Sequence, residues 1–346
     1  MERFGYLQRL CDELEAAGAA YSIFREVSSN PTTENIADGV QQVLQEGCDF
    51  VVALGGGSAL DAGKAIALVA ANGGEIWDYD KNFGKGKPVE KMPLPLIAIP
   101  TTAGTGSEAD AGFVINNLQK GLKDGIGSPY SFPVLSIVDP ELMVSLPPML
   151  TAYQGFDVLF HAMECYFNRN ATPFSDALVP ETVRRVAEFL PRAIKDGYDL
   201  EARDQMAIAS TMAGMCLSTA GTALQHAIEH SLSGVYPDLI HGCGLLLINR
   251  AYLHRCSEKP VLRDRMLGLA RAMGVEAPKS PQDLIDAMEK LRVQCGMADL
   301  KMQDFGMSPD SFSKVVAGSH GKGFYNDLGQ STNEEVLRIL NESYEQ

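Results

Sequence analysis

Residues 49–72, DFVVALGGGSALDAGKAIALVAAN, constrain the fold more than any other part of the chain. The first residues form an apolar run typical of a buried strand, three glycines follow it, and an apolar helix is expected after the glycines. A strand that turns directly into a helix begins a unit in which the next strand lies parallel to the first. The segment therefore predicts an α/β domain built on a parallel sheet.

The pattern of expected elements divides the chain into two domains. Helices are expected at 4–17 and 32–47, strands at 19–24, 93–102 and 134–140, and a hairpin at 111–126. After about residue 150 the patterns become helical, at 151–167, 173–194, 201–221, 262–274 and 280–296. We expect an α/β domain at 1–148 and an all-helical domain at 149–346, with residues 138–148 as the hinge.

Composition excludes several classes of protein. A formal charge of −15 argues against nucleic acid as a partner, because a phosphate backbone requires a basic surface. No apolar run is long enough to span a membrane, and the first residues lack the apolar core of a signal peptide. The seven cysteines are scattered without a CxxC pair, so we interpret them as reduced thiols of a cytoplasmic protein.

Two glycine-rich loops follow expected strands. The first, GGGSALDAGK at 55–64, allows close approach of an anion to a helix N-terminus, although it is neither a GxGxxG nor a Walker A motif. The second, PTTAGTGSE at 100–108, is rich in hydroxyl groups and glycine. Either loop alone could be a plain turn. Together, at the carboxyl ends of strands in one sheet, they favour a phosphorylated or dinucleotide ligand.

Five polar residues on expected helices share metal-ligand chemistry. Asp157 and His161 are four residues apart, His226 and His230 repeat that spacing, and His241 follows a short turn. One carboxylate with three imidazoles suits Fe²⁺ or Zn²⁺. A single histidine is more often an ordinary core or surface residue, but two such pairs together favour a metal site. HAIEH also matches the HxxEH pattern of zinc metallopeptidases, which uses neither glycine loop.

The chain resembles the iron-containing (group III) alcohol dehydrogenase family, within the dehydroquinate synthase-like fold. Four stretches carry the resemblance in the family's order: GGGSALDAGK, PTTAGTGSE, GFDVLFHAMECY and HAIEHSLSGVYPDLIHG. The resemblance implies that the metal ligands are Asp157, His161, His226 and His241, and that His230 is catalytic, beside the nicotinamide and substrate. The cofactor-binding residues that it implies are Asn30, Gly55, Gly56, Gly57, Ser58, Asp61, Thr101, Thr102, Thr105 and Lys123.

The function implied is transfer of a hydride between a primary or secondary alcohol and NAD or NADP, with an aldehyde or ketone as the product. A divalent cation lowers the pKa of an alcohol that binds it, and a histidine can relay the proton. A polyol dehydrogenase or dehydroquinate synthase-like lyase of the same fold is the nearest alternative, and the metallopeptidase is a remote one.

Two further expectations concern the oligomeric state and the completeness of the sheet. The resemblance implies a homodimer. It also matches residues 13–24, ELEAAGAAYSIF, to a segment that follows the family's first strand, so we expect the sheet to lack that strand. A helix that covers a parallel sheet normally follows a strand of the same sheet, whereas this sequence opens with the helix.

Overall fold

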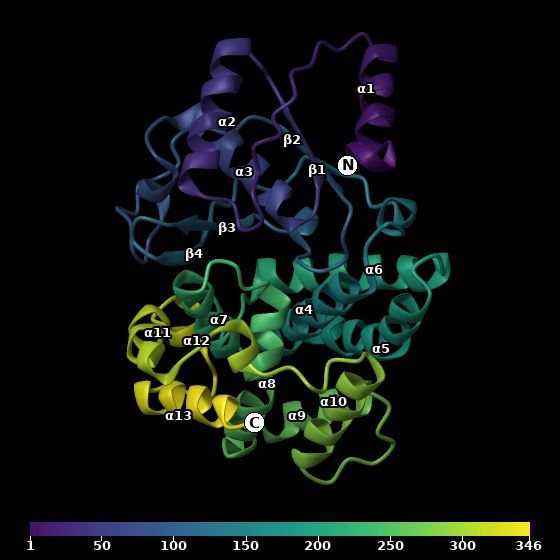
Figure 1. Cartoon of the computed structure of the whole chain (residues 1–346), viewed down its shortest axis with the longest axis vertical. Coiled ribbons are helices and arrows are strands. Elements are labelled where there is room, and N and C mark those ends of the chain that lie inside the picture. The colour runs from purple at the N-terminus through teal and green to yellow at the C-terminus, as the bar shows by residue number, and fades with distance from the viewer.

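The computed structural model describes all 346 residues and shows an α/β part and a helical part. Figure 1 places the α/β part, purple to blue, above the helical part, teal to yellow, with the N-terminus in the first part and the C-terminus in the second. The arrangement confirms the expected fold class of a parallel-sheet α/β region followed by a helical region.

The α/β part contains three helices and five strands: α1 (Tyr6–Ala16), α2 (Thr33–Glu46), β1 (Val51–Gly55), α3 (Gly57–Asn72), β2 (Leu96–Pro100), β3 (Gly112–Asn117), β4 (Leu122–Gly127) and β5 (Leu135–Ser136). Strands β1, β2 and β5 form a parallel sheet in that order, with Val51 opposite Leu96 and Gly55 opposite Pro100. Strands β3 and β4 form the expected antiparallel hairpin. Because β1 and β2 are parallel and in register, their glycine-rich extensions leave the sheet side by side.

Local sequence explains how these elements begin and end. The Thr32 hydroxyl accepts a hydrogen bond from the Asn35 backbone N–H, and the Asn35 side chain reciprocates, so α2 starts with a capping box. Gly47 ends α2 with a φ of 65°, a left-handed conformation that glycine adopts without strain. Helix α3 packs closely on the sheet at Gly63. A Cβ on Gly63 would lie only 2.8 Å from the Ala53 side chain and 3.1 Å from that of Leu96, so no larger residue fits there.

The strand expected at residues 19–24 is wrong, because this segment is neither strand nor helix and belongs to no sheet. Residues 1–50 contain no named strand, and only Thr32 makes an isolated bridge, to Asn116. The second edge of β1 is consequently without a neighbouring strand. An apolar segment forms a strand only where a partner satisfies its backbone groups, so Phe24 packs against the small α/β core without entering the sheet.

The helical part contains ten helices: α4 (Pro148–Tyr166), α5 (Pro173–Lys195), α6 (Leu200–Thr219), α7 (Leu224–Val235), α8 (His241–Ser257), α9 (Arg263–Ala272), α10 (Gln282–Gln294), α11 (Phe312–Gly318), α12 (Lys322–Asn326) and α13 (Asn333–Tyr344). They enclose a core of 52 buried apolar residues. Burial of this size fixes the helices relative to one another.

No single helix has both the length and the apolar character needed to cross a membrane. Helices α6 and α7, which are bent relative to each other, reach that length and apolar character only when they are taken together.

The two parts meet through close backbone contacts between glycines. Gly106, in the second glycine-rich loop, has a φ of 64°, and a Cβ on it would lie 2.6 Å from the Gly214 nitrogen in α6. The Glu108 carboxylate accepts a hydrogen bond of 2.8 Å from the Thr211 hydroxyl of α6. These contacts hold the second loop against the helical part, so the space beside it is bounded by both parts.

Candidate active site

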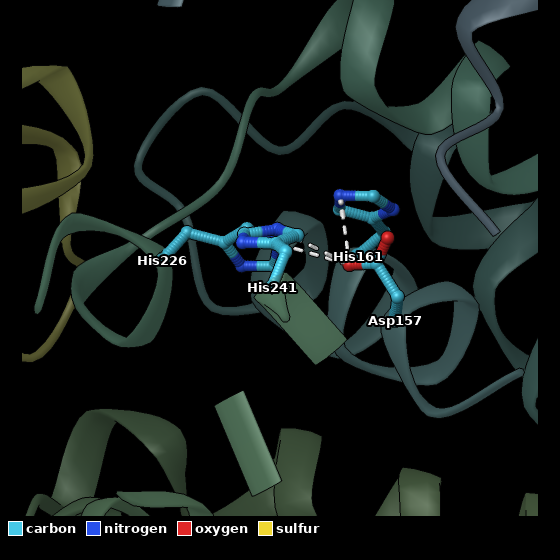
Figure 2. Close-up of side chains that lie close together, drawn as sticks. All are labelled: Asp157, His161, His226 and His241. Carbon is cyan, nitrogen blue, oxygen red and sulfur yellow. Dashed lines mark ion pairs between the residues drawn. The ribbon is translucent and has the colours of Figure 1, made fainter. Parts of the chain in front are cut away.

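Three helices bring one carboxylate and three imidazoles together. Asp157 and His161 lie four residues apart on α4, His226 lies in the first turn of α7, and His241 begins α8. Their side chains converge in Figure 2, where the dashed lines run from the imidazoles to the Asp157 carboxylate. We call Asp157, His161, His226 and His241 the four-residue cluster. The structure thus brings together all four residues that the sequence suggests as metal ligands.

The geometry of the four-residue cluster fits a divalent cation. The Nε2 atoms of His161, His226 and His241 lie 3.4, 3.5 and 3.5 Å from the same Asp157 Oδ1. Ligand atoms around a tetrahedral Zn²⁺ with bonds of roughly 2.1 Å lie about 3.4 Å apart. Asp157 Oδ1 and His226 Nε2 are buried without any hydrogen-bond partner. Buried polar atoms are rarely left unpaired, so these two atoms are suited to a ligand between them.

Two further carboxylates, which the sequence did not predict, orient the cluster. Glu164 on α4 contacts His226 Nδ1, and Glu229 on α7 contacts His241 Nδ1. Each contact fixes the ring so that Nε2 faces Asp157, the arrangement in which carboxylates orient metal-binding histidines. Glu164 also accepts hydrogen bonds from the backbone N–H groups of Ala223 and Gln225, which caps α7.

Electrostatics separates the roles of the buried groups. Although burial opposes ionisation of Asp157, the surrounding imidazoles of His161 and His241 hold its pKa well below the ordinary value. Burial lowers the pKa of His161 to about 3, so this imidazole is neutral. Burial also opposes protonation of His226, yet Glu164 and Asp157 raise its pKa to about 9. At neutral pH Asp157 is therefore ionised and His161 is neutral with an unshared electron pair, whereas His226 is protonated, so a metal that bound His226 would displace its proton.

His230 lies beside the cluster without belonging to it. Its ring centre is 5.5 Å from that of His241 and 6.2 Å from that of His226, and it lines the adjoining cavity. Burial and the nearby Lys123 ammonium lower the pKa of His230 well below its ordinary value. A neutral imidazole at this point can accept or donate a hydrogen bond to a molecule in the cavity.

A cavity of about 670 Å³ extends from the cluster along the α/β part. Such a volume is typical of small-molecule and cofactor sites. Six of the residues suggested for cofactor binding line it: Asn30, Gly57, Ser58, Asp61, Thr105 and Lys123. Gly55, Gly56, Thr101 and Thr102 are not among the lining residues. These four residues contact one another instead: the Thr101 N–H donates to the Gly55 carbonyl, and a Cβ on Gly56 would lie 3.1 Å from Thr102.

The two glycine-rich loops pack directly on each other. A Cβ on Gly57 would lie 2.3 Å from Thr105 Cγ2, a separation that atoms cannot adopt. Gly57 is also the first residue of α3, whose N-terminal N–H groups attract an anion. The Asn30 N–H donates a hydrogen bond of 3.2 Å to the Ser58 hydroxyl, which brings the segment before α2 to the same place. Glycine is therefore required here for contact between the loops.

Lys64 fastens the second loop to α3, a role that the sequence analysis missed. Its buried ammonium donates hydrogen bonds to Ser107 Oγ at 2.8 Å, Asp110 Oδ1 at 2.7 Å and the Gly112 carbonyl at 2.8 Å. Ser107 in turn donates to Asp61 at 2.7 Å, and Asp61 accepts from the Val114 N–H. Asp61 is therefore held in this network while it lines the cavity. The sequence did offer a signal for this role: Lys64 is a charged residue inside an apolar helix, three residues after Asp61 and therefore close to it on the helix surface.

Comparison with known proteins decides the family. The sequence model described as iron-containing alcohol dehydrogenase matches residues 1–140, and that of the Fe-containing alcohol dehydrogenase family, C-terminal, matches residues 151–344. The chain belongs to the iron-containing alcohol dehydrogenase family.

Individual relatives agree with the assignment. The chain is 41% identical over 238 residues to an NAD-dependent methanol dehydrogenase of Bacillus methanolicus, a match that covers 69% of this chain and 61% of that protein. It is 36% identical to alcohol dehydrogenase 4 of Schizosaccharomyces pombe, covering 94% of this chain and 76% of the relative. An archaeal halo-thermophilic alcohol dehydrogenase from a Red Sea brine pool superposes with a TM-score of 0.94 at 34% identity, covering 99% and 89% of the two chains.

The geometry of this family member does not support the metallopeptidase alternative. In an HxxEH peptidase, the glutamate serves as a general base. Here the corresponding Glu229 is fully buried and is occupied by contacts to His241 Nδ1 and the Ser233 hydroxyl. It consequently has no free oxygen with which to activate water.

Proposed function

We propose that this protein catalyses the reversible oxidation of a small primary or secondary alcohol to an aldehyde or ketone, with NAD or NADP as the second substrate. The observation that supports the proposal best is the four-residue cluster at one end of the cavity, with both glycine-rich loops along the same space. We further propose a homodimer in the cytoplasm, with the domain boundary at residues 148/149.

We propose that Asp157, His161, His226 and His241 hold Fe²⁺ or Zn²⁺, because three imidazoles and one carboxylate match the preferences of these ions. When bound, the cation supplies a Lewis acid that polarises the alcohol or carbonyl oxygen, and the nicotinamide supplies the redox chemistry. Glu164 and Glu229 keep the histidine rings turned toward Asp157 throughout.

The remaining residues bind, orient and move a proton. We propose that Gly57 and Ser58, at the N-terminus of α3, and Thr105 receive the cofactor phosphates, because backbone N–H groups and hydroxyls at a helix N-terminus bind anions. Lys123 presents a buried positive charge to the same cavity. The neutral His230 imidazole holds or relays the hydroxyl proton, because it lines the cavity next to the cluster.

The proposal is tested by measuring NADH or NADPH formation from a series of short alcohols, and its consumption with the matching aldehydes, in anaerobic buffer containing Fe²⁺. We expect turnover with at least one alcohol of fewer than about six carbons, because the cavity must hold the cofactor as well as the substrate. A protein that binds Fe²⁺ and cofactor yet turns over no alcohol or aldehyde would contradict the proposed activity.

A further inference from the structure

Glu229 contacts both a histidine of the four-residue cluster and a lysine of the cofactor cavity. Its carboxylate contacts His241 Nδ1, and its Oε2 lies 3.6 Å from Lys123 Nζ. The side chain of Glu229 is inaccessible to solvent, and that of Lys123 is only 4% exposed. Charges removed from water to this degree interact strongly, so Glu229 stabilises the Lys123 ammonium, while its contact with Nδ1 holds the His241 ring.

The Lys123 ammonium depends on Glu229 for its counter-charge. Lys123 Nζ is buried and has no hydrogen-bond partner, and Glu229 is the only carboxylate within ion-pair distance of it. Burial of an unpaired ammonium is costly. Glu229 therefore offsets that cost while the three ammonium protons remain available to a molecule in the cavity, which Lys123 lines.

The packing around Glu229 is built to admit this side chain. On α8, three residues after His241, a Cβ on Gly244 would lie 2.9 Å from Glu229 Cγ and 3.0 Å from its Oε1. The Ser233 hydroxyl, one turn along α7, donates to the same carboxylate.

Glu164 provides a built-in comparison. It contacts His226 Nδ1 as Glu229 contacts His241, and it too is completely buried. Its other partners are backbone N–H groups at the start of α7, and it makes no ion pair with a lysine. Glu164 thus serves the cluster alone, whereas Glu229 touches the cluster and the cofactor cavity.

We propose that Glu229 is a positioning residue shared by the metal and cofactor sites: it orients His241 toward the metal and holds Lys123 in place for the cofactor. The inference rests on the proposed function, because it assumes that the four-residue cluster binds metal and that the cavity binds NAD(P). It follows that loss of Glu229 weakens both binding reactions, whereas loss of Glu164 weakens metal binding only.

The test compares Glu229→Gln with Glu164→Gln. Co²⁺ affinity is measured by competition with a chelator on metal-stripped protein, and NADH affinity by fluorescence titration at saturating Co²⁺. We expect both variants to bind Co²⁺ about 10–100-fold more weakly, as is typical when a residue behind a metal ligand is lost. Only Glu229→Gln should also bind NADH more weakly, by at least roughly tenfold, as for loss of a buried charge partner. Its Co²⁺ absorption bands should shift because the basicity of His241 falls.

Gly244→Ala provides a second variant that retains every charge and displaces the Glu229 side chain. We expect it to weaken Co²⁺ and NADH binding together, in the same direction as Glu229→Gln. Unchanged NADH affinity in Glu229→Gln, or an equal loss of NADH affinity in Glu164→Gln, would overturn the inference. Failure of the unaltered protein to bind Co²⁺ or NADH would instead overturn the proposed function itself.

Discussion

Replacing His161 or His230 by alanine distinguishes a member of the four-residue cluster, which we propose binds metal, from its neighbour. Both imidazoles are neutral because burial lowers their pKa values, and both line the same cavity. His161 Nε2 lies 3.4 Å from Asp157 Oδ1, whereas His230 lies one helical turn after His226 on α7 and outside the four-residue cluster. The comparison avoids His226, because its removal would leave the buried Glu164 carboxylate without its partner.

The expected magnitudes follow from these positions. Loss of a residue behind a ligand costs about 10–100-fold in metal affinity, so loss of the His161 ligand itself should exceed about 100-fold, or roughly 2.7 kcal/mol. His230→Ala should retain metal and lose roughly 10²–10⁴-fold in kcat, the usual contribution of a proton-transfer group. His161 is buried and His230 is half-buried, so both variants lose a largely enclosed ring and should unfold at similar urea concentrations.

The assay measures metal per chain after dialysis against a weak chelator, followed by kcat at saturating Fe²⁺. The circular dichroism of each variant controls for folding. A His230→Ala protein that lost its metal, together with a His161→Ala protein that retained it, would refute the assignment of these two histidines.

Three further predictions address the cavity and the α/β part. Gly57→Val should weaken NADH binding and leave metal content unchanged, because a Cβ there would lie 2.3 Å from Thr105; equal NADH affinity in Gly57→Val and in a Gly268→Ala control would contradict the packing argument. Lys64→Met should lower the free energy of unfolding by about 3–5 kcal/mol in urea, because it leaves buried carboxylates without their cation; a loss below about 1 kcal/mol would be inconsistent with the network. Burial raises the pKa of Asp124 to about 6, above the value of 3.8 expected in the unfolded chain, so the folded state takes up a proton first as pH falls, and ionised Asp124 destabilises the fold above pH 6. Asp124→Asn should therefore stabilise the protein at pH 7.5 by up to about 3 kcal/mol, with a smaller gain at pH 5; a gain independent of pH would disprove this reasoning.

Most of the fold could be predicted from the sequence because its signals are local. The capping threonine of α2, the glycine turn after β1 and the helical periodicity beyond residue 150 each depend on neighbours in the chain. The strand expected at 19–24 was wrong because strand formation depends on a partner elsewhere, which local sequence does not specify.

The sequence predicted those site residues that lie on one helix at helical spacing, but not the contacts between residues of different elements. Asp157 and His161 share a helix face, and so do His226 and His230. Glu164 lies seven residues after Asp157 on that same face, a signal that could have identified it. The role of Glu229 could not be predicted, because its contacts with His241 and Lys123 come from other elements and leave no periodic pattern.

The central claim, that the four-residue cluster binds the metal on which alcohol oxidation depends, is tested most directly by titrating metal-stripped protein with Fe²⁺ under anaerobic conditions. NADH formation from an alcohol that the protein oxidises is followed alongside Asp157→Asn, which removes the only carboxylate of the cluster. We predict that the unaltered protein gains activity linearly and reaches its maximum at one Fe²⁺ per chain, whereas Asp157→Asn stays inactive at the same ratio. Full activity in the metal-stripped protein, or the same titration curve for Asp157→Asn, would contradict the account.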